Sequence, residues 1–478
     1  MRSCLHKLNP GLRVAFAVIF AAALRAPCSQ GALLPTPKHV FREYQLDLDR
    51  GDAWRVTDPD ATHPGAQEFL PNPAHHLPIE DLQHATRAEL ILDRWNGHPG
   101  TSDKRVRFNR GPWLRVPELT TTPPGHAPES FLAQDNPVID VPLEHLHEGV
   151  NRFSGTSDEQ ITHDFGWGQW GMYGATLRVY YDPQSKPHAT GRVIKPQASE
   201  ALKEDPLLGV EIANGTRAER VDFFARYRGP DTDGDGIYDE WHLQYRRGEL
   251  RGGIGRGRRV AEDRFEATWN TRFVPDQPPE SLELIARIRD VHGVFSTTAI
   301  TPGLSLQREG EAVWMVTPAP EDIPENFNSR KNRPKLTRFT IPKRAARDLE
   351  AATEIALHLR TWNGKGERYF LNERLDRPLP ILGHEAFGFA DRPQIQVFES
   401  LGASSQMALQ AGENLFWLRS PTVHHGAEIL WPGPVLTVRY PVPEPTSALL
   451  SAILLIWAVI RRRRLERFGS DRYRCRNG

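Results

Sequence analysis

Aspartates alternate with small residues in the segment DTDGDGIYDEWH, residues 231–242. Asp231, Asp233 and Asp235 are two residues apart, so one turn of chain would hold their carboxylates close together. Carboxylates at this spacing repel one another, and a hard divalent cation with oxygen ligands relieves the repulsion. The spacing therefore predicts a Ca²⁺ site formed by these three side chains.

The same segment resembles the calcium loops of EF-hand and thrombospondin type 3 proteins. If Asp231 is position one, Ile237 at seven would offer its carbonyl and Asp239 falls at nine. Position twelve is His242, where an EF-hand has a bidentate glutamate, and Glu240 at ten is a candidate substitute. The resemblance implies a weak site, with a dissociation constant of about 10⁻⁴–10⁻³ M. The alternative is a solvated acidic turn.

Aromatic residues are concentrated among glycines in HDFGWGQWGMYG, residues 163–174. In an exposed loop, the rings of Trp167, Trp170 and Tyr173 would stack on the C–H faces of a sugar. We predict these three as ligand-binding residues. The alternative is that the rings close over a hydrophobic core, because large aromatic side chains are usually well buried.

Motifs for catalysis are missing from the sequence. It contains no G-x-S-x-G, H-E-x-x-H, Walker or C-x-x-C pattern. We therefore expect a protein that is not an enzyme, with a glycan-active enzyme as the least favoured alternative. Residues 32–445 carry a net charge of −10, which argues against nucleic acid as a partner because phosphate binding requires a basic face.

The first 31 residues have the order of a secretory signal peptide. Basic residues come first, the apolar run 14–24 follows, and small residues lie near residues 28–31. The three cysteines all lie outside residues 33–441, so disulfides cannot hold that part of the chain together. Both features predict export, with residues 1–31 removed.

The C-terminal segment combines an extended strip, an apolar helix and a basic cluster. The strip is Pro443, Glu444 and Pro445, where proline on both sides of the glutamate prevents a helix. Residues 446–460 are uncharged and predict a short transmembrane helix. The membrane anchor ends in a cluster that the positive-inside rule places in the cytoplasm: Arg461, Arg462, Arg463 and Arg464.

This order of parts resembles the PEP-CTERM sorting signal of Gram-negative bacteria over residues 442–464. The resemblance implies a membrane-anchored precursor that an exosortase-type transpeptidase cuts near Pro-Glu-Pro. The product would reach the cell surface or an exopolysaccharide matrix. The basic tail 465–478 departs from the family pattern, which usually ends soon after the arginines. The alternative is a permanent C-terminal anchor.

The body of the chain contains a repeat. The segments TRAELILDRWNG (86–97) and TEIALHLRTWNG (353–364) match, and so do VRFN (106–109) and YFLN (369–372). Two further landmarks follow in the same order. A Leu-x-x-Gly-x-Asn pattern begins at Leu146 and at Leu409, and each copy ends in an alternating apolar strand. The copies resemble galactose-binding-like jelly-roll modules, in which such Asn and Gly residues form turns.

Between the copies, segments such as LLGVEIANG and ERVDFFARYRG predict successive strands and resemble a bacterial immunoglobulin-like sandwich. The predicted fold is all-β, with jelly-roll modules at 35–185 and 306–441 on either side of an Ig-like domain at 190–305. The expected function is a structural or adhesive role at the cell surface or in the extracellular matrix. The runner-up is a protein that binds carbohydrate such as exopolysaccharide.

Overall fold

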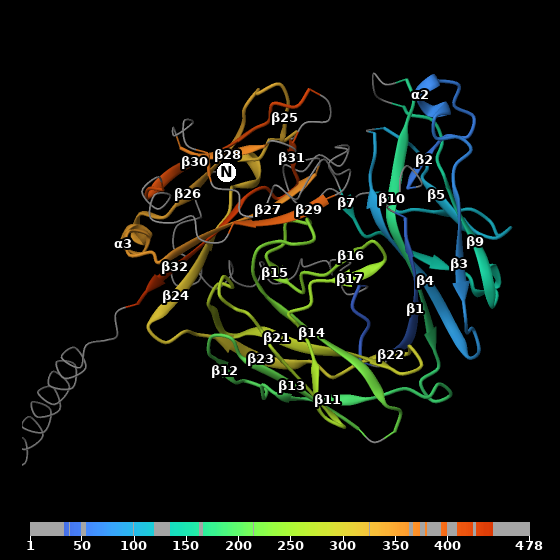
Figure 1. Cartoon of the computed structure of the whole chain (residues 1–478), viewed down its shortest axis with the longest axis horizontal. Coiled ribbons are helices and arrows are strands. Elements are labelled where there is room, and N and C mark those ends of the chain that lie inside the picture. The colour runs from blue at the N-terminus through green and yellow to red at the C-terminus, as the bar shows by residue number, and fades with distance from the viewer. Residues whose placement is uncertain are drawn as a thin grey trace, which may run out of the picture.

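The computed structural model describes thirteen stretches of the chain (Figure 1). They are residues 33–37, 39–48, 54–98, 100–118, 134–161, 166–213, 215–324, 326–362, 367–372, 378–379, 393–398, 409–423 and 427–442. Strands dominate these stretches, which confirms the predicted all-β class. The predicted signal helix and transmembrane helix lie outside the described residues. Within them, no helix has the length and apolar character needed to cross a bilayer.

The first sandwich, residues 40–181, encloses an apolar core between two antiparallel sheets. The larger sheet has the order β1-β10-β4, with β2 on β10 and both β7 and β8 on β4. Its strands are β1 (Val40–Asp47), β2 (Arg55–Thr57), β4 (Ala85–Trp95), β7 (Gln134–Asp135), β8 (Val138–Val141) and β10 (Gln169–Tyr181). The facing sheet, in order β3-β9-β5-β6, consists of β3 (Ala74–Ile79), β9 (Gly149–Thr156), β5 (Arg105–Phe108) and β6 (Leu114–Arg115). Its helices are α2 (Pro64–Gln67) and the 3-10 turn η2 (Leu143–His145).

The second sandwich, residues 191–306, has its own core. One sheet consists of β12 (Ala201–Leu202), β23 (Thr301–Leu306), β21 (Gln277–Asp290), β22 (Phe295–Thr297), β14 (Ala218–Arg228), β15 (Asp239–Glu240) and β18 (Gly255–Arg256). The facing sheet consists of β11 (Gly191–Lys195), β13 (Leu207–Ile212), β20 (Arg264–Thr268) and β19 (Arg258–Ala261). A separate hairpin consists of β16 (Gln244–Arg246) and β17 (Glu249–Arg251).

The third sandwich, residues 311–441, encloses a third core. Its larger sheet consists of β24 (Glu311–Val316), β32 (Val435–Pro441), β27 (Glu354–Trp362), β31 (Ala427–Ile429), β25 (Asn328–Ser329) and β29 (Pro393–Phe398). The facing sheet consists of β26 (Lys335–Ile341), β30 (Gly412–Arg419) and β28 (Arg368–Leu371). The helical elements are η3 (Pro320–Asp322), η4 (Lys343–Ala345) and α3 (Ala346–Glu350).

A hydrogen-bonded asparagine pair links the hairpins of the first sandwich. Asn109 has a left-handed backbone, with φ of 53°, and its Nδ2 donates to Oδ1 of Asn151 at 2.8 Å. The Oδ1 of Asn109 accepts from the backbone N–H of Arg152 at 2.9 Å. Asn151 accepts from the N–H of His147 and donates to the carbonyls of His147 and Gly149.

The third sandwich repeats this pair contact for contact. Asn372 has φ of 54°, and its Nδ2 donates to Oδ1 of Asn414 at 3.2 Å. The N–H of Leu415 donates to Oδ1 of Asn372 at 2.9 Å. Asn414 accepts from the N–H of Gln410 and donates to the carbonyls of Gln410 and Gly412. The matched asparagines in the sequence are therefore turn-forming residues with the same hydrogen bonds in both copies.

Strand β1 of the first sandwich pairs with β22 of the second, so the larger sheets of the two sandwiches form one continuous 13-stranded sheet. Strand β10 lies next to β1, in the right-hand part of Figure 1. All 13 of its residues are buried because both of its faces are covered. One face packs into the first core, and the other carries Thr176 and Arg178 toward the second sandwich. The Thr176 hydroxyl donates to the carbonyl of Gly248 at 2.6 Å. Arg178 binds Glu43 at 3.1 Å and donates to the Tyr245 hydroxyl.

Candidate metal centre

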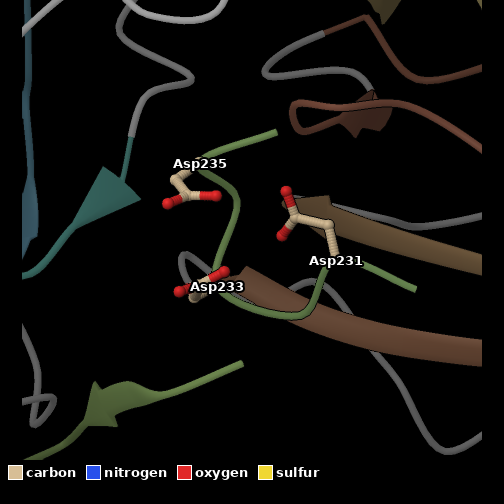
Figure 2. Close-up of side chains that lie close together, drawn as sticks. All are labelled: Asp231, Asp233 and Asp235. Carbon is tan, nitrogen blue, oxygen red and sulfur yellow. The ribbon is translucent and has the colours of Figure 1, made fainter. Parts of the chain in front are cut away.

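The acidic loop lies between β14 and β15 and is held in shape by its first aspartate. The N–H groups of Gly234 and Gly236 each donate to a different Asp231 carboxylate oxygen at 2.5 Å. Both glycines have φ in the left-handed region, 88° and 80°, which side chains disfavour. The N–H of Ile237 donates to Oδ1 of Asp235 at 2.7 Å. Figure 2 shows Asp231, Asp233 and Asp235 on this single curved segment.

The loop brings together the three aspartates that the sequence singled out. Each of Asp231, Asp233 and Asp235 offers a carboxylate oxygen within 4.8 Å of the others. Glu240 lies outside this group of three but interacts electrostatically with all three aspartates, and it is only 3% exposed. The side chain of Glu240 shares a hydrogen bond with Asp233, which requires a proton on one of the two carboxyl groups. A buried carboxylate is costly unless a cation or a proton compensates it.

The pKa values of these groups are raised by burial and mutual repulsion. Burial, and then repulsion from Asp233, raises the pKa of Asp231 to about 8. Burial and Asp235 raise the pKa of Asp233 to about 6. Burial raises the pKa of Glu240 to about 12, with contributions from all three aspartates. The raised pKa values mean that ionising these carboxylates together is unfavourable in their surroundings, and a divalent cation would offset that cost.

The remaining predicted positions have different roles. Asp239 is exposed and lies outside the cluster, where its Oδ1 is 3.5 Å from Nη2 of Arg226. Ile237 remains a loop residue whose N–H supports Asp235. His242 is buried, its pKa is lowered to about 4 by burial, and its Nε2 is bonded to the carbonyl of Tyr227. Glu240, rather than Asp239, is therefore the further buried carboxylate that interacts with the three aspartates.

The loop also touches the third sandwich. A Cβ added to Gly234 would lie 1.7 Å from Nη1 of Arg360, on β27, and 3.3 Å from the carbonyl oxygen of Trp431. Burial lowers the pKa of Arg360, while Asp231, Asp233 and Asp93 of the first sandwich act in the opposite direction. A cavity of about 210 Å³ lies beside the loop, between the second and third sandwiches. All three sandwiches thus contribute charge at one junction. In Figure 2, the brown ribbons of the third sandwich run beside the loop.

Arg360 is the functional residue that sequence reasoning missed. It lies more than a hundred positions after the loop, inside an ordinary alternating strand. Its role depends on how the sandwiches pack, and no local pattern signals that packing.

The aromatic loop proves to be largely core. Trp170 and Tyr173 are 0% and 1% exposed, so they cannot stack on a sugar, and this part of the ligand-binding prediction is wrong. Trp170 donates from Nε1 to the carbonyl of Thr156 at 3.2 Å. Trp167 is half-buried between His63 and His98, with ring centroids 6.1 and 4.9 Å away. The alternative, that the rings close over a hydrophobic core, therefore holds for Trp170 and Tyr173.

The predicted sorting residues lie outside the described part of the chain. These are Glu444 with its flanking prolines Pro443 and Pro445, and the arginine cluster at 461–464. Their roles remain predictions.

No protein-family model matches the chain, and no curated protein matches its sequence. Among solved structures, a DUF4785 family protein from Legionella pneumophila is similar at 10% identity over 88% of this chain and 89% of its own, with a TM-score of 0.23. A family 86 glycoside hydrolase, the β-porphyranase of Bacteroides plebeius, matches at 9% identity over 54% of this chain and 38% of its own, with a TM-score of 0.20. The fibronectin(III)-like modules of Clostridium thermocellum CbhA match at 10% identity over 45% of this chain and 80% of their own, with a TM-score of 0.15. Scores this low assign no function.

Proposed function

We propose that this chain is an exported, calcium-stabilised β-sandwich protein with a structural or adhesive role at the cell surface or in an exopolysaccharide matrix. One observation carries the proposal: the acidic loop, with Asp231, Asp233 and Asp235 close together, lies where the second and third sandwiches meet. A cation there would hold the sandwiches in one arrangement, which is what a scaffold requires.

The cation would be Ca²⁺, because the candidate ligands are carboxylate oxygens and Ca²⁺ accepts such ligands in a flexible coordination geometry. Asp231, Asp233, Asp235 and Glu240 would hold it, with Ile237 as a further loop ligand through its carbonyl. The ion would neutralise repulsion that otherwise forces protons onto buried carboxylates. Because the ion binds only the folded chain, it would raise the unfolding temperature.

The test is thermal unfolding of the full chain with and without 5 mM Ca²⁺, roughly five times the weakest expected dissociation constant. We expect the unfolding temperature to rise by a few degrees, corresponding to about 1 kcal/mol. Glu240→Gln and Asp233→Asn should abolish the rise. Glu309→Gln, a fully accessible carboxylate paired with Lys203, should keep it. An unchanged wild-type unfolding temperature would remove the calcium part of the proposal.

Export and sorting make up the second part of the proposal. Residues 1–31 would direct secretion, and the segment 442–464 would be processed by an exosortase-type transpeptidase. The intact mass of the surface-located protein tests both steps. We expect loss of the first 31 residues and of everything after about residue 445. A mass that still includes residues 446–478 would favour the permanent membrane anchor.

The partner in this proposal is an exopolysaccharide, and the chain acts on it by binding rather than by catalysis. Of the three aromatic residues predicted from the sequence, only Trp167 keeps enough exposure to contact a sugar. Replacing Trp167 with Ala should reduce retention on a glycan column if this ring takes part. Unchanged retention would leave the polysaccharide to another surface.

A further inference from the structure

A second, strongly polar cavity lies between the first and second sandwiches, away from the acidic loop. Its volume is about 300 Å³, at the small end of ligand pockets and suited to about one sugar ring. Its walls come from β1, β14, β21 and β22 and from residues 249–256, which include β17 and β18. Because two sandwiches build it, the cavity depends on their packing rather than on one loop.

Arginines outnumber carboxylates on the rim of this cavity. Arg220 and Arg256 share a single counter-ion, Asp222, at 2.6 and 3.3 Å. Arg251 pairs with Glu249 at 2.8 Å, and both side chains are more than half exposed. Exposed pairs of this kind are weak, so the guanidinium groups can exchange a protein carboxylate for a ligand anion at little cost.

The floor of the cavity is rigid and charged. Arg287 donates to Glu43, which also binds Arg178, and both arginines and the glutamate side chain are buried. The guanidinium of Arg287 lies over the ring of Phe295, 3.9 Å from its centroid. Phe295 also stacks on Phe41, with centroids 5.4 Å apart. The floor thus consists of fixed charges packed on buried aromatic rings.

We propose that this cavity, which we name the arginine pocket, binds an anionic sugar residue of an acidic polysaccharide. Arginine forks match carboxylate and sulfate oxygens with two parallel hydrogen bonds. Asp222 and Glu249 supply acceptors for sugar hydroxyls. The same carboxylates repel a bare inorganic anion. A lining with both arginines and carboxylates therefore favours an anion that also carries hydroxyl donors.

This inference rests on the proposed surface role, because that role brings an acidic polysaccharide to the chain. The two can fail separately. The surface role is tested by calcium and by intact mass, whereas the arginine pocket is tested by saccharide binding, which involves neither the acidic loop nor the C-terminal segment.

The test is calorimetric titration of the full chain with four probes: oligogalacturonate, a sulfated galactan oligosaccharide, a neutral galacto-oligosaccharide and inorganic sulfate. We expect one of the two acidic saccharides to bind, and the one that binds identifies the anion as carboxylate or sulfate ester. The neutral saccharide and inorganic sulfate should bind at least tenfold more weakly.

Two arginine variants distinguish binding in the arginine pocket from non-specific electrostatic attraction. Arg256→Gln removes a guanidinium whose side chain is 67% exposed, and should weaken binding about tenfold. Arg192→Gln, a 75% exposed arginine paired with Glu211 on the facing sheet, is the matched control and should leave binding unchanged. The proposal is overturned if neither acidic saccharide binds, if the two variants behave alike, or if inorganic sulfate binds as tightly as the saccharide.

Discussion

Buried charge at the residue scale is handled in two contrasting ways. In the acidic loop, burial and mutual repulsion raise the pKa values of Asp231, Asp233 and Glu240, and Arg360 opposes the rise at the two aspartates. In the first sandwich, Glu43 lies between Arg178 and Arg287 and is fully compensated. The first arrangement is the one on which the proposed calcium site rests, and the second fits a permanent structural contact.

The compensated glutamate gives a prediction about pH. Although burial raises it, the guanidinium groups of Arg287 and Arg178 hold the pKa of Glu43 below its ordinary value. The unfolded chain therefore binds more protons, so this stabilisation is present above about pH 4.3 and is lost as the pH falls further. Glu43→Gln should lower the free energy of unfolding by about 3–5 kcal/mol at neutral pH. It should also reduce the dependence of that free energy, measured by urea unfolding, on pH in the acid range. A wild-type dependence on pH in that range would contradict this.

The matched asparagines give a prediction that applies to both repeats. Asn151→Ala and Asn414→Ala each leave a backbone N–H and carbonyls without their side-chain partner. Each should destabilise its own sandwich by about 1–3 kcal/mol, measured by hydrogen exchange of β9 or β30. Gln83→Ala, on the surface of the first sandwich, is the control. A large effect in one copy and none in the other would contradict the equivalence.

At the element scale, glycines in β10 decide where the aromatic segment goes. The sequence indicates a glycine-rich loop there, but the segment belongs to β10, which extends from Gln169 to Tyr181 with a register shift between Met172 and Gly174. Gly171 and Gly174 let Trp54 and Gly248 approach its backbone, so the glycines serve packing rather than looping. The alternation of side chains along the strand then directs the Trp170 side chain into the core. The sequence does not show whether a glycine gives flexibility to a loop or makes room for a closely packed neighbour. The prediction of an exposed aromatic loop failed for this reason.

Gly174→Ala tests this close approach. The added Cβ would lie 2.3 Å from the backbone nitrogen of Gly248, so the hairpin β16–β17 must move away from β10. We expect a loss of about 1–3 kcal/mol and faster tryptic cleavage after Arg246. Gly253→Ala is the control, because its nearest neighbours are 3.5 Å or more away. Equal cleavage rates in the two variants would contradict the packing role.

Other elements were predictable because their signals are local. The strands came from apolar alternation, and the turn asparagines from their fixed spacing within each repeat. The three aspartates came from their spacing in one loop. Arg360 and the arginine pocket could not be foreseen, because distant segments create them only when the sandwiches pack.

At the scale of the whole molecule, the acidic loop connects the sandwiches. The loop belongs to the second sandwich and lies next to Arg360 and Trp431 of the third. Arg360 also interacts electrostatically with Asp93 of the first sandwich. A change in charge at the loop therefore acts on the arrangement of the sandwiches more than on any one core.

Chelation gives the prediction at this scale. Removing calcium with EGTA should increase hydrogen exchange in β27 and in the turn at residues 430–434, which face the loop. Strands β3 and β9, in the sheet on the far side of the first core, should exchange at the same rate with and without the metal. Uniform change across all three sandwiches would contradict a local junction.

The most direct measurement of the central claim is a calorimetric titration of the full chain with Ca²⁺, repeated with Asp233→Asn. The account predicts one ion bound per chain at sub-millimolar to millimolar affinity, and loss of that binding in the variant. Absence of calcium binding to the wild-type chain, or equal binding to the variant, would contradict the claim that the buried carboxylates form a metal centre.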